Sequence, residues 1–92
     1  MFSLWFQLNF SLFPTGLKTL FLRDNLIEDL VPIPEKIAKT NSLEYLDLGR
    51  NLIEHVPSGY FKAFPRLNIL LLDGNLLLSI SFMDLPKGVQ LA

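Results

Sequence analysis

Leucine recurs along the chain at a fixed spacing, and the same spacing occurs in three segments. These segments begin at Leu17, Leu43 and Leu67, and each reads L-x-x-L-x-L-x-x-N-x-L, with isoleucine in the last place in two of them. The Leu-x-Leu alternation is typical of a short strand that turns one face inward. The pattern therefore predicts a strand near Tyr45–Leu48 and one at the corresponding place in each of the other two segments.

The repeated pattern resembles that of the leucine-rich-repeat family, which has this form. In the second segment the likeness to the typical subtype, of about 24 residues, continues beyond the asparagine. The residues that carry it are Ile53, Val56, Pro57, Phe61 and Phe64. The resemblance covers roughly residues 17–91 and implies a short or partial array. It implies an α/β solenoid, with a curved parallel sheet on the concave side and short helical or irregular returns on the convex side.

An asparagine stands at the same place in each segment, where the chain has to leave the strand in a sharp turn. The amide side chain of asparagine carries both donors and an acceptor. We therefore expect Asn25, Asn51 and Asn75 to stack and to satisfy backbone groups of neighbouring coils.

The segments between the strands differ in their suitability for helices. Residues 34–39 begin with proline and are predicted to form one or two helical turns. Residues 58–64 are predicted to form a short helix that Ser58 caps and Pro65 ends. Residues 84–88 are poorer helix material.

The first part of the chain is less regular than the rest. We interpret residues 1–16 as a degenerate N-terminal coil or cap, and residues 17–92 as the leucine-rich-repeat domain with repeats that start near 17, 43 and 67. Met1, Leu4, Phe6 and Asn9 fit the start of a repeat with substitutions, but the distance to Leu17 is too short for a normal coil. Leu91 falls where a fourth repeat would open.

A signal or anchoring segment is the alternative interpretation of residues 1–16, because they are apolar and uncharged. A signal peptide has a positive start, which is missing here, and polar residues and a proline interrupt the apolar run. A transmembrane helix needs about 20 predominantly apolar residues. The run is therefore short for a transmembrane helix. Membrane association is expected only if this segment is a signal or an anchor.

The composition narrows the function classes. The chain has a formal net charge of −1 and no cysteine, and 50% of its residues are hydrophobic. The charge does not favour nucleic acid as a partner. The missing cysteine excludes disulfides and thiolate metal sites, and it slightly favours a cytoplasmic location, with a secreted or membrane-associated one left open.

The sequence predicts no catalytic, cofactor or metal site. His55 is the only histidine, and we expect it to face solvent without a second ligand nearby. No nucleophile stands at a readable spacing from a base, which argues against an enzyme. Asp47 and Asp73 fall in different columns of the expected sheet, and we interpret them as surface charges. Asn9-Phe10-Ser11 matches the acceptor sequence for N-glycosylation, although a buried Asn9 would not be accessible.

The resemblance implies that partners bind on the concave face, through the variable positions of each strand. Carried over by position, the candidate residues are Thr19, Phe21, Arg23, Tyr45, Asp47, Arg50, Ile69, Leu71 and Asp73. Exposed aromatic and arginine residues are typical of binding hot spots. Alternatively, the charged members form ordinary cross-strand pairs, and the apolar members contact flanking chain.

The function expected from this pattern is a protein–protein recognition module with a protein partner of unknown identity. The alternative is a non-autonomous fragment of a larger leucine-rich-repeat receptor, adaptor or ligase. A fold does not by itself determine a function, so both expectations depend partly on the family likeness.

Overall fold

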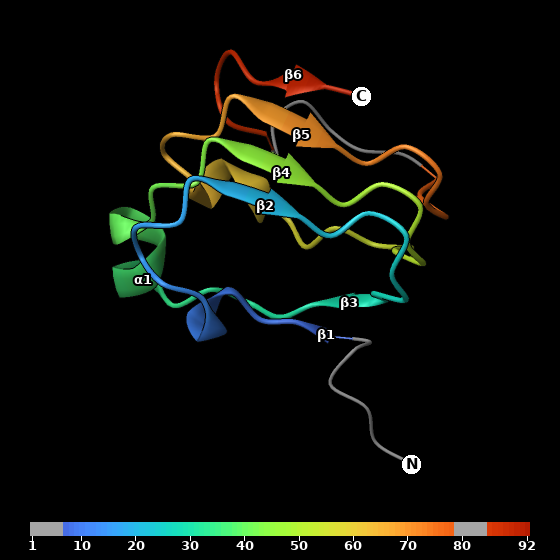
Figure 1. Ribbon diagram of the computed structural model, residues 1–92, viewed down its shortest axis with the longest axis horizontal. Coiled ribbons are helices and arrows are strands. Elements are labelled where there is room, and N and C mark those ends of the chain that lie inside the picture. The colour runs from blue at the N-terminus through green and yellow to red at the C-terminus, as the bar shows by residue number, and fades with distance from the viewer. Residues whose placement is uncertain (1–6, 79–84) are drawn as a thin grey trace.

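Successive coils of the chain stack side by side, and each contributes one short strand to a parallel sheet (Figure 1). The computed structural model describes residues 7–78 and 85–92. The sheet contains, in order, β2 (Thr19–Phe21), β4 (Tyr45–Asp47), β5 (Ile69–Leu71) and β6 (Gln90–Leu91). The predicted leucine-rich-repeat solenoid, with its parallel sheet and short returns, is confirmed.

The register of the sheet puts equivalent leucines of the repeats beside one another. Leu20, Leu46 and Leu70 are paired in neighbouring strands, and Leu46 and Leu70 have no exposed surface. The residues on either side of them point to the other face, as the alternation along a strand requires. The hydrophobic core therefore lies directly behind the sheet.

The fourth strand departs from the predicted spacing. Leu91 was expected to open a repeat, at the place of Leu43 and Leu67, but it lies opposite Leu70, so this expectation was wrong. Paired leucines are 24 residues apart from Leu46 to Leu70 (70 − 46) and 21 apart from Leu70 to Leu91 (91 − 70). The third coil reaches the sheet with a shorter return, and this shifts the register of everything after it.

The returns on the convex side carry little regular structure. The first coil returns through β3 (Asp29–Leu30) and α1 (Glu35–Thr40), which confirms the predicted helical turns. The second returns through η3, a 3-10 helix at Phe61–Ala63, whose N-cap position is held by Tyr60. The predicted cap at Ser58 was wrong, because Gly59 has a φ of 71° and this left-handed residue separates Ser58 from the helix. Of the segment 84–88, Asp84 lies outside the described residues, and the rest forms a turn.

The N-terminal segment joins the return side of the solenoid. β1 (Gln7–Leu8) pairs in parallel with β3 in a separate two-stranded sheet, and η2 (Phe10–Leu12) follows as a 3-10 helix. Asn9 caps η2, and its side-chain oxygen accepts a hydrogen bond from the N–H of Ser11 at 3.0 Å. Asn9 is therefore no ladder residue, because it follows a strand of the separate two-stranded sheet and its side-chain oxygen caps η2. Met1, Leu4 and Phe6 lie outside the described residues.

An aromatic cluster connects η2 with the return of the second coil. The ring of Phe10 meets that of Phe64 edge-on, with centroids 4.9 Å apart, and Tyr60 packs beside both. The hydroxyl of Tyr60 donates a hydrogen bond to the carbonyl oxygen of Val31 at 2.8 Å. Burial raises the pKa of Tyr60. The N-terminal segment and the second coil thus share one core.

Candidate functional site

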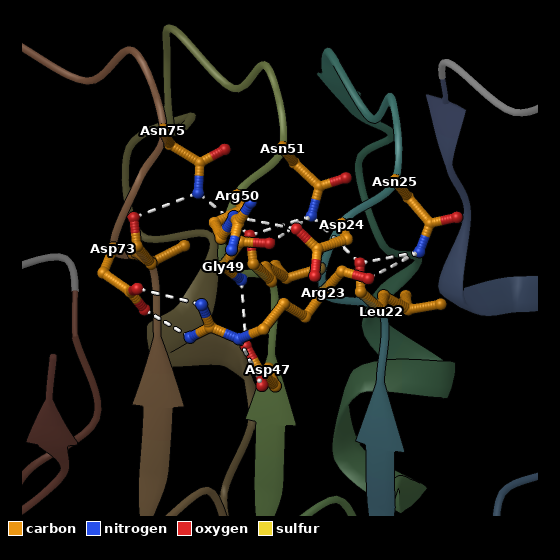
Figure 2. A network of polar contacts seen from close by, with 12 residues as sticks. Leu22, Arg23, Asp24, Asn25, Asp47, Gly49, Arg50, Asn51, Asp73 and Asn75 are labelled. Carbon is orange, nitrogen blue, oxygen red and sulfur yellow. Dashed lines mark hydrogen bonds and ion pairs between the residues drawn. The ribbon is translucent and has the colours of Figure 1, made fainter.

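An asparagine ladder closes one end of the strands (Figure 2). The oxygen of Asn51 accepts the N–H of Ile27 from the preceding coil at 3.1 Å, and its nitrogen donates to the carbonyl of Leu22 at 3.0 Å. Asn75 repeats the first of these contacts with the N–H of Ile53 at 3.0 Å. The ladder predicted from the sequence is confirmed for these two coils, where one amide satisfies backbone groups of two coils.

Asn25 makes a different set of contacts. Its nitrogen donates to the carbonyl oxygens of Leu22 and Arg23 in its own coil, and the side chain is exposed. The residue before each ladder asparagine has a left-handed φ: 62° at Asp24, 53° at Arg50 and 72° at Gly74. The same tight turn therefore ends all three strands.

Arg50 was predicted as part of the binding face, and the structure places it in one of these turns. Its Nε lies 2.8 Å from Oδ1 of Asp24 in the equivalent turn of the preceding coil. Both side chains are largely exposed, so the pair contributes little to stability. Arg50 therefore borders the sheet.

Arg23 spans the sheet and ties three coils together, as Figure 2 shows. Its Nε donates to Asp47 at 3.0 Å, and its two terminal nitrogens donate to the two carboxylate oxygens of Asp73 at 3.0 and 2.5 Å. The guanidinium lies over Gly49, where a side-chain carbon would collide with it. Glycine at this position is what allows the arginine to lie across the strands. We call Arg23, Asp47, Gly49 and Asp73 the arginine clamp.

The clamp shifts the pKa of Arg23 and that of Asp73. The hydrogen bonds that Arg23 donates to Asp73, and then the one that it donates to Asp47, raise the pKa of Arg23 further above its usual range. In return, the hydrogen bond from Arg23 lowers the pKa of Asp73. Asp47 is only 7% exposed and also accepts the N–H of Gly49 at 2.9 Å, so the interpretation of Asp47 as a surface charge was wrong. The cross-strand pairing considered for these charges is present.

The apolar candidates form a strip on the same sheet. The side chain of Phe21 is 67% exposed, and its ring lies 5.3 Å from that of Tyr45 at an interplanar angle of 54°. Ile69 and Leu71 continue the strip on β5 and are half-buried. We call Phe21, Tyr45, Ile69 and Leu71 the apolar strip, and Thr19 lies exposed beside it in the row that contains Tyr45 and Ile69.

The sequence missed one residue of this face. Gln90 lies beside Ile69 in the row of Thr19 and Tyr45 and is exposed. Leu91 could have indicated this position, because Gln90 precedes it as Ile69 precedes Leu70. The third coil is shorter than the second, so the repeat spacing assigned Leu91 to a different position of the repeat. The face therefore extends over four strands.

The remaining candidates for chemistry lie apart from this face. The side chain of His55 is 86% exposed, as predicted, and its Nε2 is 3.9 Å from Glu54. Within residues 7–78 and 85–92, no three histidine, aspartate or glutamate side chains are grouped so that they could hold a metal ion. No helix in that part of the chain is both long and apolar enough to cross a membrane.

Comparison with known proteins agrees with this architecture. The family described as "Leucine rich repeat" matches residues 15–77 and again residues 41–91, and the chain belongs to that family. It is similar to keratocan from Mus musculus, with 38% identity over 73 residues, 77% of this chain and 19% of keratocan. For keratocan from Homo sapiens the identity is 38% over 72 residues, 76% of this chain and 19% of keratocan. The chain thus spans about a fifth of the length of these curated relatives, and no solved structure matches it.

Proposed function

We propose that the concave face binds another protein, and that the apolar strip makes the central contact. The observation that carries this proposal is Phe21, a large aromatic side chain on a sheet strand with two-thirds of its surface in contact with solvent. Such a residue gains free energy when a partner covers it, about 25 cal/mol for each Å² of apolar surface removed from water.

The side chains of the apolar strip are already ordered in the absence of a partner. Phe21 and Tyr45 rest on each other, and both belong to strands that are hydrogen-bonded to their neighbours. A surface whose side chains are already ordered loses less conformational entropy on binding. This favours recognition of a folded or extended protein segment that presents apolar side chains.

The arginine clamp supplies the polar part of this face. Asp47 lies between Phe21 and Leu71 in the paired strands, whereas Arg23 and Asp73 lie just beyond the strand ends. Arg23 already has hydrogen-bond partners in Asp47 and Asp73, so it cannot form a full bidentate contact with a partner unless it leaves them. We therefore assign the clamp a role in shaping the face, and the apolar strip the role of direct contact. In this proposal the chain is a non-enzymatic recognition module that needs no cofactor.

Site-specific photo-crosslinking tests the proposal. A benzophenone amino acid replaces Ile69 in the strip, or Leu12 on η2 as a matched control, because Leu12 is also apolar and is 72% exposed. We expect a discrete protein adduct from position 69 and not from position 12. We also expect Phe21→Asp to remove that adduct, because it puts a charge where the contact forms.

The partner identified in this way is then purified and titrated against the chain. Phe21→Asp is expected to weaken the complex at least tenfold, in the range of a hot-spot residue, and Leu12→Asp to leave it unchanged. Equal crosslinking from both positions, or equal affinities of the two variants, would overturn the proposal.

A second proposal is that these coils work as part of a longer leucine-rich-repeat receptor, adaptor or ligase. The coverage of only 19% of each keratocan supports it. Thermal unfolding followed by circular dichroism, with light scattering in parallel, separates the two proposals. A sharp transition in a monomer supports an autonomous module, whereas a broad transition or aggregation supports coils that need neighbours.

A further inference from the structure

A row of leucines runs along the edge of the solenoid, outside the sheet. Each ladder asparagine is followed by a leucine, which gives Leu26, Leu52 and Leu76. Leu26 is 55% exposed, Leu76 is 51% exposed, and Leu52 between them is half-buried. They lie in the loops that follow β2, β4 and β5, at the right of Figure 1. We call these three residues the leucine row.

Backbone hydrogen bonds set the spacing of this row. The N–H of Leu52 donates to the carbonyl of Ile27 at 2.9 Å, and the N–H of Leu76 donates to that of Ile53 at 3.0 Å. The loops are thus held side by side in the same way as the strands, about 4.8 Å apart. The row is a fixed feature of the stack and is not produced by freely moving loops.

A groove beside the row has an acidic border. It has a volume of about 490 Å³, and Leu52, Leu76, Leu30 and Pro57 form its apolar part. Its polar lining comes from Glu28, Asp29, Glu54 and His55. None of the described residues that line it is a lysine or an arginine. Three carboxylates of a chain whose formal net charge is only −1 therefore line the same groove as these apolar side chains.

We propose that the leucine row and its groove form a second binding surface, and that its occupant is an amphipathic helix of a partner protein with lysine or arginine beside its apolar stripe. Charge complementarity selects the basic flank, because like charges facing each other across an interface are strongly unfavourable. The apolar floor selects leucine-like side chains on the other face of the helix.

The spacing of the row suits a helix laid along the axis of the solenoid. Side chains at positions i, i+3 or i+4, and i+7 lie on one face of a helix, and each turn rises by about 5.4 Å. Coils about 4.8 Å apart present one leucine for nearly every turn of such a helix. An extended strand rises about 3.3 Å per residue, with every second side chain on one face, so its apolar side chains fall about 6.6 Å apart and match the row less well.

This surface differs from the apolar strip in both chemistry and position. The strip consists of strand residues with the arginine clamp beside it, whereas the row lies in the turns and is bordered by carboxylates. A partner on the row does not need Phe21. The inference therefore stands whether or not the concave face binds a protein.

A designed peptide tests the proposal directly. The probe is a fluorescein-labelled helix of about 14 residues, with leucines on one face and lysines on both flanks. Fluorescence anisotropy is measured with the 92-residue chain as titrant. We expect saturable binding that weakens with added salt, because the groove and the peptide carry opposite charges.

Matched variants identify the surface. Leu76→Gln is expected to weaken binding about fivefold, since it removes roughly half a leucine side chain of contact. Glu28→Lys combined with Glu54→Lys is expected to weaken it about tenfold and to remove most of the salt dependence. Leu12→Gln, an exposed leucine on η2, and Phe21→Gln on the apolar strip are expected to bind as the unchanged chain does.

Three outcomes would overturn the proposal. The first is no anisotropy change at all. The second is equal binding of a peptide with glutamate in place of lysine, or of one with the same residues in an order that breaks the stripe. The third is loss of binding in Phe21→Gln but not in Leu76→Gln, which would assign the peptide to the concave face. Circular dichroism of each variant verifies that the fold is retained.

Discussion

The first and second coils carry the same repeat, yet equivalent residues of the two coils are buried to different degrees. In the second coil, Leu46 has no exposed surface and Asn51 is 2% exposed. At the same places in the first coil, Leu20 is half-buried and Asn25 is exposed. The strand of the second coil has a neighbour on each side, whereas β2 is one of the two edge strands of the described four-stranded sheet.

The contribution of a repeat residue to stability therefore depends more on the coils beside it than on the type of residue. In a solenoid each unit contacts only the adjacent units, so stability comes from the interfaces between them. Substitution of the same leucine or asparagine should therefore cost more stability in a coil with two neighbours than in a coil with one.

The largest expected effect concerns the core leucines. Leu46→Ala should lower the free energy of unfolding by about 2–5 kcal/mol, because it leaves a cavity between two coils. Leu20→Ala should cost clearly less, since part of that side chain is already in water. Chemical denaturation of both variants measures the difference, and equal losses would contradict the comparison.

The ladder offers a second and smaller contrast. Asn51→Ala leaves the buried N–H of Ile27 without its acceptor, and it should cost about 1–3 kcal/mol for an unsatisfied buried group. Asn25→Ala should cost about 0.5 kcal/mol, because water can replace the contacts of an exposed amide. Thermal and urea unfolding provide the test, and a larger loss in Asn25→Ala would reverse our ranking.

Tyr60 joins the two coils, since its hydroxyl in the second bonds to Val31 in the return of the first. Tyr60→Phe should cost about 1 kcal/mol at neutral pH. Burial raises the pKa of Tyr60, so the unfolded chain loses this proton first, and stability should fall as the pH rises above about 10. Unfolding between pH 7 and 11 should show a smaller alkaline loss in Tyr60→Phe, and an unchanged loss would exclude Tyr60 as its source.

The smallest expected effect concerns the arginine clamp, which reaches from the first coil to the third. The hydrogen bond from Arg23 lowers the pKa of Asp73. The interaction between the two side chains therefore stabilises the fold at neutral pH, and this stabilisation is lost as the pH falls through the lowered pKa. Asp73→Asn should lower the thermal midpoint slightly at pH 7 and not in strong acid.

Gly49→Ala provides the matched test, because its side chain displaces the guanidinium of Arg23. It should reproduce the effect of Asp73→Asn and add little to it in the double variant. Fully additive losses would mean that the two residues act independently.

The sequence predicted the repeating part of this fold well. The strands β2, β4 and β5 with their paired leucines, two links of the asparagine ladder and the helix near residues 34–39 all follow from local spacing. These features depend on a few neighbouring residues and on the need to bury one face of each strand. Six of the nine candidate residues of the concave face lie in the paired strands, and Arg23, Arg50 and Asp73 lie just beyond the strand ends. The use of all nine in binding stays a prediction.

Other features depended on how the coils meet. The repeat spacing allowed Arg23, Asp47 and Asp73 to pair across the strands, but it does not indicate that Asp47 is buried or that Asn9 caps a helix. The register of the last strand likewise depended on the length of the third return.

Local residue spacing thus specifies the repeating unit of this protein, which is a leucine-lined strand that ends in an asparagine turn. Only the tertiary structure decided which of those leucines and asparagines are buried, which charges pair across the sheet, and which apolar rows remain open to solvent. The physical reason is that the periodicity of a strand is a local property, whereas burial and long-range ion pairs depend on the neighbour that each coil happens to have.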